Sequence, residues 1–138
     1  MYLNHYETIT RHGINLCSEL SGEIDPFDYC EGDDTRGVVC YDGNVSFEVN
    51  GVEYYIFFSA AWYEDDTFDY WEEGDMRVRK ASDDDEYLTA EEVTTIEKAF
   101  GGAANVYQAL LDAMAKATEA AKPRAMQYLK DCIDNGEF

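Results

Sequence analysis

Aromatic and acidic side chains alternate along residues 62–75, which read Trp-Tyr-Glu-Asp-Asp-Thr-Phe-Asp-Tyr-Trp-Glu-Glu-Gly-Asp. Four carboxylates lie between Trp62 and Trp71, and three more follow. Carboxylates bind Arg and Lys through charge-assisted hydrogen bonds, and Trp and Tyr bury much area at small entropic cost. The segment therefore predicts a surface for a basic protein. The alternative is a loop whose aromatic side chains pack into the core.

The charge of the chain is strongly asymmetric. Its 30 acidic and 10 basic residues give a formal net charge of -20. Residues 1–97 hold 25 acidic and 5 basic residues, whereas residues 98–138 hold 5 of each. Such an excess destabilises a fold by self-repulsion and repels nucleic acids and anionic membranes. We expect a basic partner, no direct binding of nucleic acid and no membrane contact. Adaptation to high salt is disfavoured, because it would spread acids over every face.

The elements that position these acids include one well-defined hairpin. Asn50-Gly51 is the strongest short-range hairpin signal, because a type I′ turn needs positive φ at both central residues. Residues 45–49 and 52–62 are rich in β-branched and aromatic side chains, as strands are. The turn fixes the register, so alternate side chains of both strands form one apolar, core-facing side.

The other side of this hairpin is predicted to be negative. Glu48 faces Glu53 in the same register, a like-charge pair that destabilises a sheet. Tyr55 and Phe57 lie beside the pair on the same side. We therefore add this face to the expected binding surface.

The rest of the chain predicts a single α+β domain, residues 1–138. Apolar residues at steps of three, four and seven between Tyr2 and Leu20 predict an N-terminal helix. Asp25 through Gly37 reads as an acidic loop, and Asp42-Gly43-Asn44 as a turn. The expected fold is an antiparallel three- to four-stranded β-meander packed with the N-terminal helix and two to three C-terminal helices. These elements are a helix at 2–20, strands at 38–41, 45–49, 52–62 and 76–80, and helices at 89–100, 103–121 and from Pro123 onward.

Metal-binding and catalytic motifs are absent from the sequence. The acidic runs 31–34 and 83–86 do not fit the EF-hand spacing, and runs of adjacent acids are usually solvated. Cys17, Cys30, Cys40 and Cys132 form no CxxC pair, so we expect free thiols and no cofactor. Two histidines make neither a zinc site nor a triad, and thirty acids single out no catalytic pair. We expect a protein that is not an enzyme.

Small size, extreme acidity and many aromatic residues resemble, in composition only, viral inhibitors of restriction enzymes, CRISPR nucleases and DNA-repair glycosylases. This likeness implies a cytoplasmic nucleic-acid mimic that blocks the DNA- or RNA-binding groove of a host defence protein. The binding part would be about residues 17–97, and the neutral helical scaffold, about 98–138, could support a homodimer. The alternative is an immunity-type protein that neutralises a basic toxin or effector. The residues expected to bind the partner are Asp33, Asp34, Glu48, Glu53, Trp62, Tyr63, Glu64, Asp65, Asp66, Asp69, Tyr70, Trp71, Glu72, Glu73 and Asp75.

Overall fold

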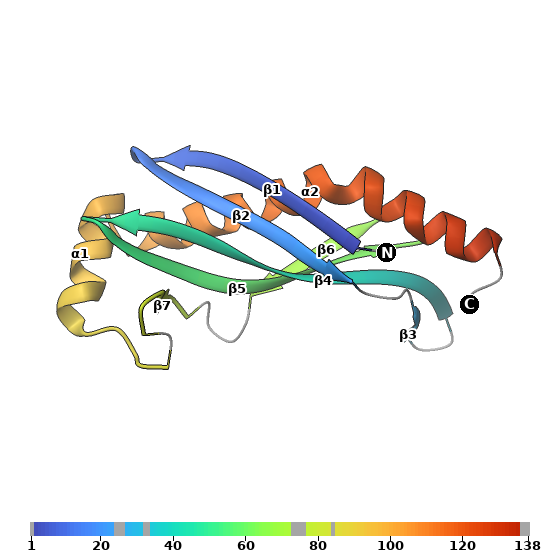
Figure 1. Cartoon of the computed structure of the whole chain (residues 1–138), viewed down its shortest axis with the longest axis horizontal. Coiled ribbons are helices and arrows are strands. Elements are labelled where there is room, and N and C mark those ends of the chain that lie inside the picture. The colour runs from blue at the N-terminus through green and yellow to red at the C-terminus, as the bar shows by residue number, and fades with distance from the viewer. Residues whose placement is uncertain (1, 24–26, 32–33, 73–76, 84, 136–138) are drawn as a thin grey trace.

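The computed structural model is an α+β fold, in which a curled antiparallel sheet is covered on one face by a long helix (Figure 1). It describes residues 2–23, 27–31, 34–72, 77–83 and 85–135. The sheet order is β1-β2-β4-β5-β6, with β3 paired to β4 and β7 paired to β5. The elements are β1 (Tyr2–Arg11), β2 (Ile14–Glu23), β3 (Phe27–Glu31), β4 (Asp34–Val49), β5 (Val52–Tyr63), β6 (Phe68–Glu72), β7 (Arg79–Lys80), α1 (Ala90–Phe100) and α2 (Ala103–Asp134).

The predicted N-terminal helix is wrong, because these residues form the hairpin β1–β2. His12 and Gly13 make its two-residue turn, with φ of 54° and 76°, the positive values of a type I′ turn. Ile9 pairs with Leu16 across the strands. Leu16 and Leu20 are fully buried on the side that faces α2. The N-terminal segment therefore adds two strands to the sheet.

The β4–β5 hairpin has the predicted register. Asn50 and Gly51 have φ of 52° and 78°, and Glu48 pairs with Glu53. The predicted turn at Asp42-Gly43-Asn44 is wrong, since β4 runs straight through it. Gly43 is needed there for close packing of strands: a Cβ atom would lie only 2.3 Å from the backbone oxygen of Glu19. The predicted acidic loop is likewise replaced by β3 and the first part of β4.

Two helices follow the sheet. The helix predicted at 89–100 is α1: a capping box between Thr89 and Glu92 starts it, and Gly101, with φ of 83°, ends it. α2 is one helix of 32 residues, so the predicted break at Pro123 is wrong. Proline disfavours a helix interior, but Ala121 and Ala125 on either side of it are fully buried. Packing on both sides of Pro123 therefore keeps the helix continuous.

The core lies between α2 and one face of the sheet. The alanines of α2 that face the sheet are buried and let the helix approach closely. Trp62 is fully buried, and its Nε1 donates to the carbonyl oxygen of Thr118 at 3.1 Å. Arg11 pairs with Asp112 at 3.2 Å, which ties β1 to α2. Among the described residues, neither helix is long and apolar enough to cross a membrane.

Candidate protein-binding surface

The sheet has a second face, opposite α2, which we call the open face. Side chains there alternate with the core residues of the same strands: Tyr55 and Phe57 lie on it, whereas Ile56 and Phe58 are buried. Phe57 is 40% exposed and Tyr6 is 63% exposed, so no other described element covers them. The described side chains on the open face include Tyr6, Thr8, Thr10, Asn15, Cys17, Glu19, Asp42, Asn44, Ser46, Glu48, Glu53, Tyr55, Phe57 and Ser59.

The pair Glu48 and Glu53 is the feature of this face that folding does not explain. The two residues are directly opposite in the register of β4 and β5, and both are exposed. Neither carboxylate has a hydrogen bond or ion pair with another part of the chain that the structure describes. Like charges that face each other across strands destabilise the sheet by a few tenths of a kcal/mol to about 1 kcal/mol. A cationic side chain between them would relieve this repulsion.

Two adjoining hollows surround the pair. One, of 440 Å³, is lined by residues of β2 together with Glu48 and Glu53. The other, of 390 Å³, is lined by Glu19, Tyr55 and Phe57 among others. Both include Ser46 and Glu53 in their walls, so they form one continuous recessed area. Each hollow thus offers carboxylates at its wall and a volume that suits a long side chain.

Aromatic rings border the recessed area. The rings of Tyr55 and Phe57 pack edge to face, with centroids 5.1 Å apart. Arg79, on β7, lies opposite Tyr55, and its guanidinium is 5.5 Å from the Phe57 ring centre. An Arg from a partner could stack on such rings in the same way, since a guanidinium is attracted to the face of an aromatic ring.

The other carboxylates of the open face already have local partners. Glu19 accepts a hydrogen bond from the Tyr6 hydroxyl at 3.4 Å, and Asp42 accepts one from Ser59 at 2.7 Å. Between Asp42 and Glu48, the open-face positions of β4 hold Asn44 and Ser46. The carboxylates of this part of β4 are therefore spread out and do not form a row with one acid at every second residue.

The predicted acidic segment lies at the opposite end of β5 from the hairpin pair. Glu64, Asp65 and Asp66 are exposed in the turn between β5 and β6. Asp66 has φ of 72° and lies 3.7 Å from the Lys122 ammonium of α2. Glu64 is eleven residues after Glu53, so the strand path between them is about 36 Å at about 3.3 Å per residue, and the curl of the sheet makes the direct distance shorter. The residues predicted as one surface thus form two separated acidic groups.

The remaining predicted residues are divided between core, surface and undescribed positions. Trp62 belongs to the core and offers no side chain to a partner. Tyr63 is half-buried, Tyr70 is half-buried against the core, and Asp69 is exposed. Asp34 begins β4, and Trp71 and Glu72 end β6, but their side chains are not among those described. Asp33, Glu73 and Asp75 lie outside the described residues.

Sequence reasoning missed the contribution of β1 and β2 to this face. Tyr6, Cys17 and Glu19 lie on it because the N-terminal segment is a hairpin. The signal was present, since Ile14, Leu16, Ser18 and Leu20 follow a period of two. The open face is therefore wider on this side than predicted.

An ion pair fixes β7 against α1 at the hairpin end of the sheet. The Lys80 ammonium lies 3.0 Å from the Glu92 carboxylate. The pKa of Glu92 lies below its usual value, first because the Thr89 backbone N–H donates to it and then because Lys80 does. The pKa of Lys80 is raised by the same hydrogen bond to Glu92. This contact positions β7, and with it Arg79, beside the open face.

Within the described part of the chain, no group of three or more His, Cys, Asp or Glu side chains could hold a metal ion. Cys17 and Cys132 are not joined in a disulfide. The arrangement of charges and aromatic rings is thus one that can bind a basic protein. No protein-family model, no curated protein and no solved structure matches this chain.

Proposed function

We propose that this protein is an inhibitor that binds a basic, nucleic-acid-binding protein through its open face. The observation that carries the proposal is the pair Glu48 and Glu53, exposed, directly opposed and without a cation on the described chain. A fold keeps a destabilising arrangement where a function needs it. A Lys or Arg of the partner would complete the pair, and the protein would act by binding and not by catalysis.

The chemistry of the recessed area suits Arg in particular. A guanidinium binds carboxylates bidentately and stacks on aromatic faces, whereas an ammonium acts as a point charge. Glu53 provides a carboxylate to both hollows, and Tyr55 with Phe57 provides the rings. Arg and Lys side chains also line the grooves that bind nucleic acid, which makes such a groove the natural target of this face.

The distance between the two acidic groups supports the nucleic-acid-mimic form of the proposal. The strand path between Glu53 and Glu64 is about 36 Å, so their separation is at most about one turn of B-form DNA, about 34–36 Å. A groove that contacts phosphates within one turn of each other could therefore contact both groups. The target would be a host defence nuclease, of a restriction, CRISPR or related system, and the protein would act in the cytoplasm.

A second candidate, an immunity-type protein, is favoured by one specific observation. The described carboxylates of the open face are spread among Asn44, Ser46, Tyr55 and Phe57 and do not repeat regularly. Irregular spacing suits contacts with the individual shape of one toxin or effector better than it suits imitation of a regular phosphate backbone. Both candidates require the same basic partner and the same face.

Competition with DNA separates these candidates. The tagged protein is used to retain partners from a bacterial lysate at moderate salt, and the retained proteins are identified by mass spectrometry. We expect one DNA- or RNA-binding protein to be enriched and to be released by added duplex DNA. A specific partner that DNA does not release would contradict the mimic and support the immunity-type protein, and retention of no specific protein would contradict both.

A further inference from the structure

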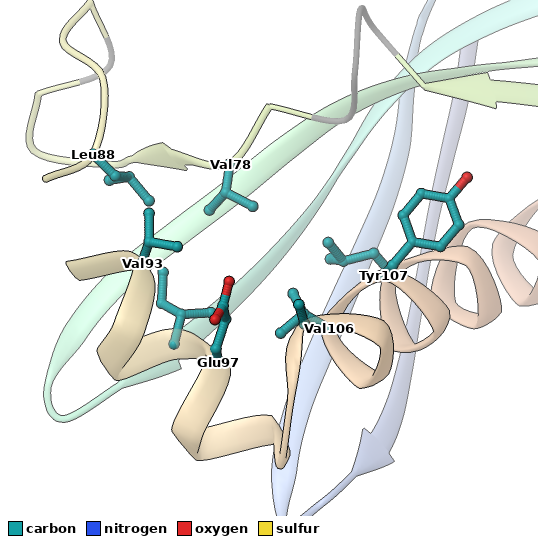
Figure 2. A pocket seen from close by; sticks show the side chains of 9 residues that line it. Val78, Leu88, Val93, Glu97, Val106 and Tyr107 are labelled. Atoms are coloured by element: carbon teal, nitrogen blue, oxygen red, sulfur yellow. The ribbon is translucent and has the colours of Figure 1, made fainter. Parts of the chain in front are cut away.

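A separate recess lies between the two helices and the residues Val78 and Leu88 (Figure 2). Its volume is 180 Å³, and it shares no lining residue with the hollows of the open face. Its wall is formed by α1, by the start of α2, and by Val78 and Leu88. The apolar part of its lining includes Val78, Leu88, Val93, Ile96, Val106 and Leu110.

One charged side chain, Glu97, interrupts this apolar lining. Figure 2 shows its carboxylate between the α1 and α2 side chains, with Val78 and Leu88 on the far side of the recess. The side chain of Glu97 has no hydrogen bond or ion pair with any described residue. A carboxylate in apolar surroundings is unfavourable unless a cation or a donor accompanies it. The recess therefore combines an apolar volume with one unpaired negative charge.

The mouth of the recess is also apolar. Val93 is 39% exposed and Tyr107 is 49% exposed at its edge, and Tyr87, next to Leu88, is 78% exposed. Exposed apolar groups that gather around a recess mark sites where another molecule binds. The Tyr87 ring carries the Arg77 guanidinium 3.8 Å from its centre, so the adjoining surface is held in place.

The volume of the recess limits the size of the group that it can bind. A cavity of about 150 Å³ accommodates benzene, whereas pockets for drug-sized ligands measure about 300–1,000 Å³. The observed 180 Å³ therefore fits one large apolar side chain and is too small for a larger ligand. Protein interfaces commonly insert one apolar anchor into a pocket of this kind.

We propose that this recess binds a Leu, Met or Phe side chain of the partner protein, with a neighbouring Lys or Arg of the partner paired to Glu97. The inference rests on the proposed basic partner, but it places a second contact on a different surface. Such an anchor adds a shape-specific contact and binding energy to an attraction that is otherwise electrostatic, because a side chain buried in a fitted pocket contributes affinity that only a matching partner gains.

Short capped peptides test the recess without knowledge of the partner. The probe is acetyl-Ala-Leu-Lys-Ala-amide, and the readout is the NMR shift of the Val93 and Val106 methyl groups. We expect saturable shifts with a Kd of about 1 mM or above, since one side chain and one ion pair supply little affinity. The peptide with Glu in place of Lys, and the one with Ala in place of Leu, should bind at least about threefold more weakly.

Two variants locate the site. Glu97→Gln should raise the Kd of the Leu-Lys peptide by about threefold to tenfold, as expected for loss of a charge-assisted contact. Ala103→Leu, at the exposed first position of α2, should fill the recess and abolish the shifts. The proposal is overturned if the Val93 and Val106 methyls do not shift, or if the Lys and Glu peptides bind equally. It is also overturned if the free amine phenethylamine binds at least about tenfold more tightly than the peptide, which would indicate a small-molecule site.

The double variant Glu48→Lys/Glu53→Lys distinguishes failure here from failure of the proposed function. It leaves the recess unchanged, so it should bind the peptide like the unaltered protein. Peptide binding by this variant, together with unchanged retention of the partner, would support the recess and reject the open face. Loss of the partner without any peptide shift in the unaltered protein would do the reverse.

Discussion

The two faces of the sheet use the same strands for different purposes. On the covered face, Ile56 and Trp62 are fully buried against α2, and the Trp62 Nε1 finds a backbone acceptor. On the open face, Glu48 and Glu53 oppose each other without a described cation. One face is arranged for stability, and the other keeps an arrangement that reduces stability. The comparison therefore directs the search for function to the open face, where the Glu48–Glu53 pair lowers the stability of the sheet.

The largest expected effect is the difference in stability loss when a large side chain is replaced by alanine on the covered face and on the open face. Trp62→Ala should lower the free energy of unfolding by about 3–5 kcal/mol, because it leaves a cavity and removes the donor to Thr118. Phe57→Ala, on the open face, should cost less than about 1 kcal/mol. Chemical denaturation of both variants measures the difference. Equal losses would mean that Phe57 is part of the core and that the open face is not open.

Gly43 tests how closely the strands approach within the sheet. Gly43→Ala should destabilise the protein by about 1–3 kcal/mol, since the new Cβ would overlap the backbone oxygen of Glu19. Ser46→Ala, on the same strand and facing the open side, is the matched control and should change stability little. Thermal denaturation of the pair is sufficient. A Gly43→Ala protein as stable as the control would remove the packing explanation for a glycine inside β4.

Two glycine-containing segments of the β4–β5 region, Asn50-Gly51 and Asp42-Gly43-Asn44, show what the sequence could and could not predict. Asn50-Gly51 determined the β4–β5 register, including the Glu48–Glu53 pair, because a two-residue turn leaves one pairing. Asp42-Gly43-Asn44 has the composition of a turn, yet Gly43 serves a close contact with β2. That contact depends on a strand far along the chain, so local composition could not reveal it.

The N-terminal hairpin was missed because its pattern fits two periods. The steps from Tyr2 to Tyr6 and from Leu16 to Leu20 are four residues, which is one helical turn and also two strand repeats. The step of seven from Ile9 to Leu16 spans the hairpin turn, where the two residues pair. His12-Gly13 is the signal that separates the readings, since both residues adopt positive φ.

Only part of the candidate binding surface was predicted correctly, again because local sequence does not show how the strands run. The hairpin pair followed from register, but the segment 62–75 was treated as one surface. Strand geometry buries Trp62 and places Glu64, Asp65 and Asp66 in the turn at the far end of β5 from Glu53. Ala113, Ala117, Ala121 and Ala125, in the middle of α2, are buried. A homodimer that uses the helical part, about residues 98–138, stays a prediction.

A smaller effect sharpens the comparison on the open face itself. Glu53→Lys should raise the free energy of unfolding by about 0.5 kcal/mol, because it turns a repulsive cross-strand pair into an attractive one. The gain should shrink at about 1 M salt, where the Debye length is about 3 Å. Glu86→Lys, at an exposed loop position, is the control and should show no such gain. A Glu53→Lys protein of unchanged or reduced stability at low salt would contradict the idea that the pair is a cost to the fold.

The smallest effect concerns the ion pair that positions β7. The pKa of Glu92 is lowered, so its contribution to stability is present above its usual value of 4.5 and is lost as pH falls through the folded-state pKa. The pKa of Lys80 is raised, so its contribution is present below 10.5 and is lost as pH rises through its folded-state pKa. Glu92→Gln should flatten the acid limb of a stability-against-pH curve, and an unchanged limb would assign it to other carboxylates.

The central claim is that the partner binds the Glu48–Glu53 pair, and charge reversal tests it most directly. Equal amounts of the unaltered protein, of Glu48→Lys/Glu53→Lys and of Asp131→Lys/Asp134→Lys are used to retain partners from the same lysate. The two double variants change the net charge equally, but the second places the change on the exposed side of α2. We expect the unaltered protein and the α2 variant to retain the same basic protein and the hairpin variant to lose it. Equal retention by all three proteins, or equal loss in both variants, would contradict the claim.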